Sequence, residues 1–226
     1  MNFYNLYHGD SREVLKQLDS NSVDMVITDP PYGFGKFRTD DENCVTLTRD
    51  VLKECSRVMK EGAFALVFAP TNQTLIDMIN ESPLKFNRLL WMNKPNDMTF
   101  PWARWLLTSE AIMVFTNGKA NMKLLGDVYH SDTYISNHGK KTKWKHPTMK
   151  PLEVIEEIVK SSPENGVILD PFLGSGTTMF ACQNLRRSCI GIELESEHVE
   201  TVKKRCFGRQ FLTHQVKYEF YNNSCD

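Results

Sequence analysis

Short apolar runs bounded by turn-forming residues recur along the chain, and segments with helical periodicity separate them. Most of these runs are rich in β-branched and aromatic residues, as expected for strands that are covered on both faces. The predicted strands are Phe3–Tyr7, Val23–Thr28, Ala63–Phe68, Arg88–Met92, Ala111–Phe115, Val167–Asp170 and Cys189–Glu193. Strands that alternate with helices predict an α/β fold, in which crossover helices cover a sheet.

The segments between the strands place apolar residues at helical spacing. The predicted helices are Ser11–Leu18, Thr46–Lys60, Thr71–Asn80, Pro151–Ser161, Thr177–Leu185 and Glu195–Arg205. Ser11 is a residue type that caps helices, and we expect it to cap the first of them. Pro151 suits the opening position of another helix, because proline fixes φ and the N–H that it lacks would have no helical partner there.

The alternation of strand and helix patterns is interrupted in two polar regions with weak periodicity, Gly33–Asn43 and Thr116–His146. A chain of 226 residues is long enough for one sizeable core, so we expect a single domain over residues 1–226. A long irregular stretch inside a compact domain is usually functional or disordered. Residues 116–146 are therefore expected to form a small insertion within the domain.

The composition is that of an ordinary globular protein, with 41% hydrophobic and 24% charged residues. No apolar run approaches the ~18 residues that a membrane-spanning helix needs. The segment Met1–Asp10 lacks the basic start and apolar run of a signal peptide. We therefore expect a cytoplasmic protein.

The six cysteines are scattered and include no C-x-x-C pair. They are Cys44, Cys55, Cys182, Cys189, Cys206 and Cys225. That spacing suits neither a zinc site nor a disulfide framework, so a reducing compartment and no metal ion are expected.

The formal net charge of −1 gives no global basic field of the kind that nucleic-acid binders often carry. Positive charge is nevertheless concentrated in one segment that contains no acidic residue. Its lysines are Lys140, Lys141, Lys143, Lys145 and Lys150. Charge alone fits a solvated loop.

The segment Val167–Thr178 runs as a strand, a glycine-rich turn and a helix start, which lets backbone approach a ligand closely. It is not a phosphate-binding loop of the G-x-x-x-x-G-K type, because no lysine follows Gly176. Asp170 would repel a phosphate but suits a cationic ligand, such as a sulfonium or an amino group. Glu193 ends the next strand, about 20 residues further on, where an acid can bind ribose hydroxyls. The pattern favours an adenosine-containing ligand; a tight structural crossover is the alternative.

The strand Val23–Thr28 leads directly into Asp29-Pro30-Pro31-Tyr32. Because prolines lack an N–H and fix φ, this strand end is rigid and rich in acceptors. The Asp29 carboxylate and the Pro30 carbonyl can accept both N–H bonds of one amino group, while Tyr32 can stack on a flat ring. Two such acceptors would turn the nitrogen lone pair toward an incoming methyl group. The alternative is a strand followed by a polyproline turn.

Together these motifs resemble the amino-methylating DNA methyltransferases, the N6-adenine and N4-cytosine group. The matching segments are the catalytic tetrapeptide Asp29–Tyr32, the cofactor loop Asp170–Thr178, the ribose-binding strand end Gly191–Leu194, the methionine-covering segment His146–Leu152, the adenine-contacting element Gly9–Ser11 and the strand Trp91–Pro95 beside the target base. The catalytic motif precedes the cofactor motif, as in the circularly permuted beta class.

The resemblance implies a Rossmann-like methyltransferase fold with a seven-stranded mixed sheet, helices on both faces and the last strand antiparallel. It also implies S-adenosylmethionine as cofactor and double-stranded DNA as substrate, with the target base flipped out of the duplex. Asp29, Pro30, Pro31 and Tyr32 would then form the catalytic set. The implied cofactor set is Asp10, Thr148, Lys150, Pro151, Asp170, Pro171, Phe172, Gly174, Ser175, Gly176, Thr177, Thr178, Glu193 and Leu194.

Within this family the insertion 116–146 becomes the expected target-recognition segment, and it is short for direct readout of bases. Recognition could be completed by the 33–43 loop or by a second subunit in a homodimer. The resemblance also changes the interpretation of Lys140, Lys141, Lys143 and Lys145, which are now expected to contact DNA phosphates.

An aspartate rather than a serine opens the tetrapeptide, and by resemblance this favours N6-adenine as the target. Cytosine N4 methylation, which uses the same acceptors, is the nearest alternative. A non-catalytic DNA- or cofactor-binding protein is an alternative from another class, and the complete Asp29–Tyr32 set speaks against it. Methylation of RNA or of a protein amide also stays open.

Overall fold

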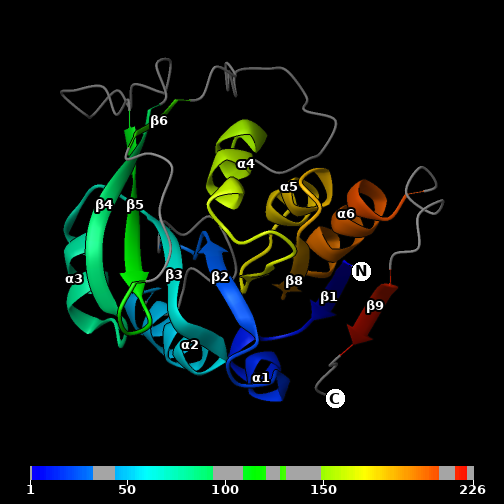
Figure 1. The fold of residues 1–226 in the computed structure, drawn as a ribbon, viewed down its shortest axis with the longest axis horizontal. Coiled ribbons are helices and arrows are strands. Elements are labelled where there is room, and N and C mark those ends of the chain that lie inside the picture. The colour runs from blue at the N-terminus through cyan, green and yellow to red at the C-terminus, as the bar shows by residue number, and fades with distance from the viewer. Residues whose placement is uncertain are drawn as a thin grey trace.

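The computed structural model describes residues 2–32, 44–93, 109–120, 128–130, 149–208 and 217–222, and these residues form one central sheet with helices packed against it (Figure 1). The strands are β1 Phe3–His8, β2 Val23–Thr28, β3 Met59–Ala69, β4 Lys85–Asn93, β5 Ser109–Thr116, β6 Val128–His130, β7 Val167–Asp170, β8 Ser188–Glu193 and β9 Lys217–Asn222. Their order across the sheet is β6-β4-β5-β3-β2-β7-β8-β1-β9.

The seven predicted strands form the continuous centre of this sheet, from β4 to β1, and the α/β prediction is confirmed. Two further strands, which the sequence did not predict, extend it: β6 pairs with β4, and β9 pairs with β1. Every pair is parallel except those of β5, which is antiparallel to both β3 and β4. The antiparallel strand is therefore not the last one in this chain, because the permuted order places it fifth.

The six predicted helices are present on the two faces of the sheet. They are α1 Ser11–Val14 with the 3₁₀ turn η1 Leu15–Gln17, α2 Cys44–Val58, α3 Gln73–Glu81, α4 Leu152–Lys160, α5 Thr177–Asn184 and α6 Ser196–Cys206. One core cluster packs side chains of α1, α2 and α3 against one face, and a second packs α4, α5 and α6 against the other.

Strand β3 shows how the sequence supplies both cores. Ala65 and Val67 belong to the first cluster, whereas Leu66 and Phe68 belong to the second. Successive side chains of a strand point to opposite faces, so an uninterrupted apolar run fills both layers. Helices therefore cover both faces of the sheet. A ligand has to bind at the ends of the strands.

Several boundary predictions need correction. Pro151 is the residue before α4 and not its first residue, because its ψ of 129° is not helical. The cap of α1 is Asp10, whose carboxylate accepts the Arg12 N–H at 2.8 Å, whereas the Ser11 hydroxyl donates to the Pro171 carbonyl. Helix α2 ends at Val58 rather than at Lys60, because Met59 already pairs with β2 in the sheet. The first predicted helix divides into α1 and a 3₁₀ turn.

Strands β2 and β7 lie side by side at the middle of the sheet and run in the same direction. The chain continues from β2 to β3 on one side and from β7 to β8 on the other. Such a reversal of strand order is a topological switch point, and α/β sheets bind ligands in the crevice at the carboxyl ends of these strands. The residues that follow β2 and β7 therefore face a shared site.

Within the described ranges, the thiols of Cys44, Cys55, Cys182, Cys189 and Cys206 are buried and form no disulfide, while Cys225 lies outside these ranges. No group of three His, Cys, Asp or Glu residues in that part of the chain could hold a metal ion. Among the described helices, none is long and apolar enough to cross a membrane.

Candidate active site

Asp29 follows the last residue of β2, and both of its carboxylate oxygens have partners. Oδ1 accepts a hydrogen bond of 2.5 Å from the Tyr32 hydroxyl, and Oδ2 lies 2.8 Å from the Lys150 ammonium nitrogen. The side chain of Asp29 keeps 28% of its surface exposed. The predicted catalytic acid is thus fixed in orientation and still accessible to a ligand.

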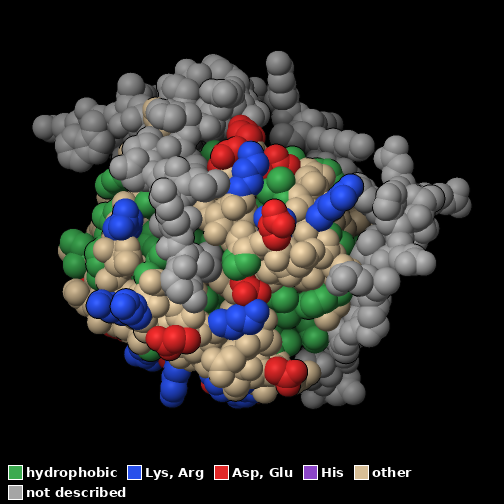
Figure 2. Space-filling view, viewed as in Figure 1, with side chains coloured by type: hydrophobic (Ala, Val, Ile, Leu, Met, Phe, Trp, Pro, Cys, Tyr) green, Lys and Arg blue, Asp and Glu red, His purple; other side chains and the backbone are tan. Residues whose placement is uncertain are grey.

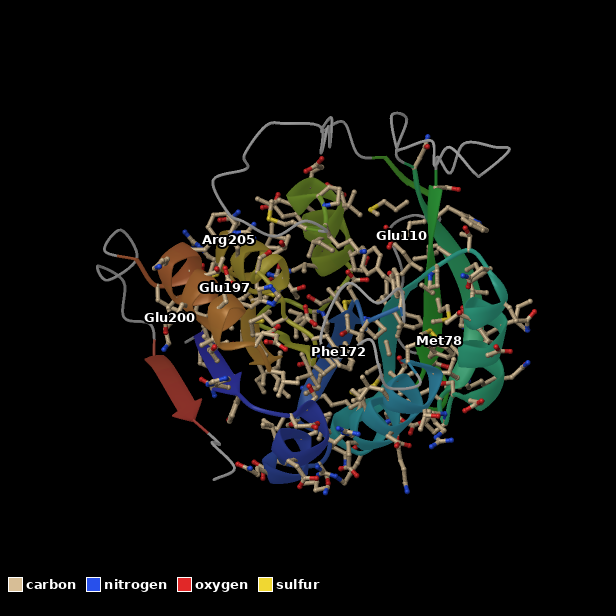
Figure 3. All side chains as sticks on the ribbon, turned by 180° about the vertical axis from the view of Figure 1, so that it is seen from behind. Met78, Glu110, Phe172, Glu197, Glu200 and Arg205 are labelled. Carbon is tan, nitrogen blue, oxygen red and sulfur yellow. The ribbon has the colours of Figure 1, made fainter. Side chains whose placement is uncertain are left out.

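Glu110 completes this group, and sequence reasoning missed it. Its Oε1 atom accepts from the Tyr32 hydroxyl at 2.8 Å and from Lys150 Nζ at 2.6 Å. Glu110 stands near the start of β5, and Figure 3 shows it beside that strand. Because β5 runs against its neighbours, its beginning lies at the edge where β2 and β3 end.

Hydrogen bonds and ion pairs therefore connect four side chains in one network, which we call the acidic cluster: Asp29, Tyr32, Glu110 and Lys150. It combines two carboxylates with a single ammonium group. Burial raises the pKa of Asp29, and the Glu110 charge adds to this rise, while Lys150 opposes it. Burial alone would lower the pKa of Lys150, but the two carboxylates outweigh it and raise that pKa, so the ammonium stays charged.

The ring of Tyr32 lies under the same ammonium group. Lys150 Nζ stands 5.5 Å from the centroid of Tyr32 and 4.9 Å from that of Phe68, both within the range of cation–π contacts. Lys150 was predicted to contact the cofactor, and in the structure its charged end pairs with Asp29, the predicted catalytic acid. Of the other tetrapeptide members, Pro30 is buried and Pro31 is partly exposed.

Asp170 ends β7, and its carboxylate holds the start of the glycine-rich loop. Its Oδ1 atom accepts from the Phe172 N–H and from the Thr28 hydroxyl, each at 3.1 Å. Burial, with only 4% of Asp170 exposed, raises the pKa of its carboxyl to about 7, although bonds from Thr178, Phe172 and Thr28 partly counteract this. Asp170 thus joins the cofactor loop to the strand that carries Asp29.

The loop itself turns on two glycines in the left-handed region, Gly174 at φ 56° and Gly176 at φ 84°. Glycine adopts this conformation without the steric cost that a Cβ would bring. The Gly174 N–H donates to Glu193 Oε2 at 2.6 Å, and Glu193 Oε1 accepts from the Glu195 N–H at 2.8 Å. Glu193, which ends β8 as predicted, consequently lies against the loop.

The start of α1 contacts the glycine-rich loop. The Gly9 N–H donates to the Glu193 carbonyl at 2.9 Å, which keeps the ends of β1 and β8 together. Ser11 bonds to Pro171, so the element that contains Asp10 is tied to the loop. Leu194, next to Glu193, is 46% exposed and offers an apolar surface on which a flat ring can pack.

Arg205 on α6 is a second residue that the motifs did not reveal. Its Nη1 atom donates to the Ser175 carbonyl at 3.2 Å and to the Thr177 hydroxyl at 3.0 Å. The side chain is buried behind the glycine-rich loop, and Figure 3 labels it on α6. Arg205 therefore ties the loop to α6.

The remaining predicted residues divide into two groups. Pro151 and Thr178 are buried at the starts of α4 and α5. Thr148, the 33–43 loop and the lysines Lys140, Lys141, Lys143 and Lys145 lie outside the described residues. On the face shown in Figure 2, described Lys and Arg side chains are interspersed with Asp and Glu, which agrees with the balanced net charge.

The geometry fits an adenosine with a cationic tail at the carboxyl ends of β7, β8 and β1. Two left-handed glycines open the loop, Glu193 supplies an acceptor, and Leu194 supplies an exposed apolar surface. Asp29 lies at the end of the adjoining strand β2, where a second ligand could meet that tail. The two halves predicted from the sequence thus belong to one site.

Comparisons with known proteins show the family of this chain. A family model described as DNA methylase, of the N6/N4 methyltransferase type, matches residues 23–204. The type II methyltransferase M.HpaI of Haemophilus parainfluenzae is 31% identical over 85% of this chain and 71% of its own length. The DNA adenine methyltransferase YhdJ of Escherichia coli is 26% identical over 88% of this chain and 81% of its own.

Solved structures show the same likeness. The complex of M1.HpyAVI with S-adenosylmethionine (SAM) superposes with a TM-score of 0.71 at 27% identity, over 90% of this chain and 99% of that chain. The cytosine-N4-specific PvuII DNA methyltransferase shares the fold, with a TM-score of 0.74 at 18% identity, over 96% and 89% of the two chains. The chain therefore belongs to the DNA methylase family and is an S-adenosylmethionine-dependent, amino-methylating DNA methyltransferase.

Proposed function

We propose that this protein transfers the methyl group of S-adenosylmethionine to the exocyclic N6 of adenine in double-stranded DNA. The observation that carries the proposal is the position of Asp29, whose accessible carboxylate stands at the end of β2, directly beside the cofactor loop at the end of β7. The bound cofactor supplies an electrophilic methyl group on a positively charged sulfur. The chain supplies the acceptors that orient the amine.

Asp29 and the Pro30 carbonyl receive the two N–H bonds of the target amine. A neutral aromatic amine is a poor nucleophile, because its lone pair is delocalised into the ring. Acceptors that hold both N–H bonds out of the ring plane favour a tetrahedral nitrogen with its lone pair free. Tyr32, with Lys150 5.5 Å from its ring centroid, provides the flat surface on which the flipped base stacks.

Asp29 also receives the proton that the amine loses when its nitrogen gains the methyl group. A carboxylate in contact with the amine is placed to take that proton. Burial raises the pKa of Asp29, which makes it a stronger base than a solvent-exposed aspartate. The Lys150 charge works in the opposite direction and favours the ionised form from which the cycle starts.

We assign the cofactor to the ends of β7, β8 and β1. Glu193 accepts from the ribose hydroxyls, Leu194 packs against the adenine with Asp10 nearby, and the Gly174–Gly176 turn leaves room for the amino-acid tail. The left-handed φ angles of both glycines and the exposure of Leu194 support this assignment. Asp170 and Arg205 hold the loop in shape, since each bonds to loop atoms.

Adenine is favoured over cytosine because an aspartate opens the tetrapeptide. YhdJ, a relative that is 26% identical, is named a DNA adenine methyltransferase, which supports the same choice. DNA contacts are assigned to the insertion 116–146 and to its lysines Lys140, Lys141, Lys143 and Lys145, where phosphates would be neutralised. Taking the base out of the duplex costs about a few kcal/mol, which these contacts have to offset.

One experiment tests the substrate and the target atom together. The purified protein is incubated with unmethylated double-stranded DNA and S-adenosylmethionine that carries an isotopically labelled methyl group, and the DNA is then digested to nucleosides for mass spectrometry. The proposal predicts labelled N6-methyldeoxyadenosine. Labelled N4-methyldeoxycytidine would contradict the choice of base, and no label in the DNA would contradict the proposed activity.

A further inference from the structure

The Tyr32 hydroxyl lies between two carboxylates, 2.5 Å from Asp29 Oδ1 and 2.8 Å from Glu110 Oε1. A tyrosine hydroxyl carries a single proton, so it can donate fully to only one of these oxygens at a time. Both distances are within hydrogen-bond range. The hydroxyl therefore has two alternative acceptors. Its proton can move from one to the other by little more than a rotation about the Cζ–Oη bond.

Asp29 has to accept the target amine on the same carboxylate. Its Oδ2 atom is occupied by the Lys150 ammonium at 2.8 Å, and its Oδ1 atom is occupied by the Tyr32 hydroxyl. Charge-assisted O–H···O⁻ bonds are among the stronger hydrogen bonds of proteins. A carboxylate oxygen can accept two hydrogen bonds, as Glu110 Oε1 does, but a donor that is already bound weakens the second bond. The amine is therefore held more strongly at Oδ1 when the Tyr32 hydroxyl donates elsewhere.

We propose that Glu110 is a positioning residue for methyl transfer, which takes over the Tyr32 hydroxyl and so releases Asp29 Oδ1 to the target amine. This inference rests on the proposed function and adds a residue to its site. Glu110 acts through Tyr32 and Asp29 and does not itself hold the methyl group or the amine.

The placement of Glu110 suits this role. Its backbone is fixed in the sheet, where Glu110 pairs with Met92 and its neighbour Ala111 pairs with both Ala69 and Trp91. Its side chain is only 10% exposed, so water does not readily replace it as the acceptor. The Lys150 ammonium, 2.6 Å from the same Oε1 atom, keeps the carboxylate in place. Glu110 thus offers an acceptor that is ready before the DNA arrives.

A purely structural role would be to neutralise Lys150, because Glu110 also pairs with that ammonium. The two roles differ in one respect. Release of Asp29 requires the Tyr32 hydroxyl, whereas the pairing with Lys150 does not. A double-mutant cycle between Glu110 and Tyr32 separates them, because any effect through Lys150 is present in both Tyr32 backgrounds.

The cycle uses the full chain with Glu110→Leu, Tyr32→Phe and the double variant, and it measures kcat for methyl transfer to DNA. Glu110→Leu removes the alternative acceptor, and we expect kcat to fall by about tenfold or more. In the Tyr32→Phe background there is no hydroxyl to relocate, and the same substitution is expected to cost about twofold or less. Equal losses in the two backgrounds would overturn the inference.

Glu110→Gln is the matched variant, because its amide oxygen can still accept the Tyr32 hydroxyl without a charge. We expect it to recover a large part of the activity that Glu110→Leu loses, and a loss as deep as that of leucine would overturn the inference. Calorimetric titration with S-adenosylmethionine verifies that each variant retains a folded cofactor site. If the unaltered protein transferred no methyl group, the proposed function would fail, and this inference with it.

Discussion

The Thr28 hydroxyl donates a hydrogen bond of 3.1 Å to the Asp170 carboxylate across 142 residues of sequence. Thr28 ends the strand that leads to Asp29, and Asp170 opens the cofactor loop. This bond therefore connects the part of the site that we assign to the target amine with the part that we assign to the cofactor. Both residues are buried, so the coupling is protected from water.

Thr28→Val should weaken this coupling with little change in side-chain shape. The Asp170 carboxylate would keep its bonds from Phe172 and Thr178 but lose the one from Thr28, and a hydrogen bond to a charged group contributes about 1.5–3 kcal/mol to the free energy of unfolding. Thr201→Val removes an exposed hydroxyl that bonds to a helix carbonyl, and this control should change stability by less than about 0.5 kcal/mol. Urea denaturation compares the two variants. Equal stabilities would contradict the importance of the Thr28–Asp170 bond.

Asp170 should also make the stability depend on pH. Burial raises the pKa of its carboxyl from 3.8 to about 7 in the folded protein. Between these values the folded state retains a proton that the unfolded chain releases, so the free energy of unfolding should fall as pH rises through this window. The contribution of this one group is at most about 1.4 kcal/mol per pH unit.

Asp170→Asn removes this titration and keeps an oxygen acceptor for Phe172 and Thr28. Denaturation of the cofactor-free protein between about pH 4 and pH 7 should therefore show a smaller decline in the variant than in the unaltered protein. Identical pH dependence in the two proteins would mean that Asp170 does not titrate in that window.

Glu193→Ala should weaken cofactor binding, because it removes both the proposed ribose acceptor and the bond to Gly174. Hydrogen bonds to charged groups contribute about 1.5–3 kcal/mol, so the dissociation constant should rise by at least about tenfold. Glu197→Ala, on the exposed face of α6, is the control and should bind normally. Calorimetry measures both affinities. An unchanged affinity of Glu193→Ala would place the ribose elsewhere.

Glu110→Gln should shift the pH profile of catalysis. Burial is the main factor that raises the pKa of Asp29; the Lys150 charge lowers this pKa and the Glu110 charge raises it further. Tyr32 and Asp170 are the other titratable groups near Asp29. Removing the Glu110 charge should lower the pKa of Asp29, so that Asp29 stays ionised at lower pH. The acid limb of kcat is thus expected to move to lower pH. A limb that stays in place or moves upward would contradict this electrostatic coupling.

Most of the fold was predictable because the apolar runs of the strands and the helical periodicity between them are uninterrupted. Two edge strands were missed for different reasons. β6 has only three residues, which is too short for an alternating pattern to stand out. β9 has the sequence KYEFYN, in which charged and aromatic residues alternate at first, and that pattern was a usable signal.

The candidate site was predicted where its residues end a strand, as Asp170 and Glu193 do, or directly follow one, as Asp29 does. Glu110 was not predicted as a site residue because it lies near the start of its strand. Only the reversed direction of β5 brings it to the carboxyl ends of β2 and β3. Lys150 was found as part of a motif, but its pairing with Asp29 depends on a tertiary contact across 121 positions of sequence. Arg205 belongs to an amphipathic helix, and no local pattern separates it from the solvated basic residues around it.

The most direct test of the account is Asp29→Ala, followed by two measurements on the same protein. Calorimetry should show an affinity for S-adenosylmethionine close to that of the unaltered chain, because the proposed cofactor site is at the ends of β7, β8 and β1. Transfer of a labelled methyl group to DNA should be lost, because the amine has no carboxylate to orient it. Methyl transfer at a near-normal rate would contradict the account.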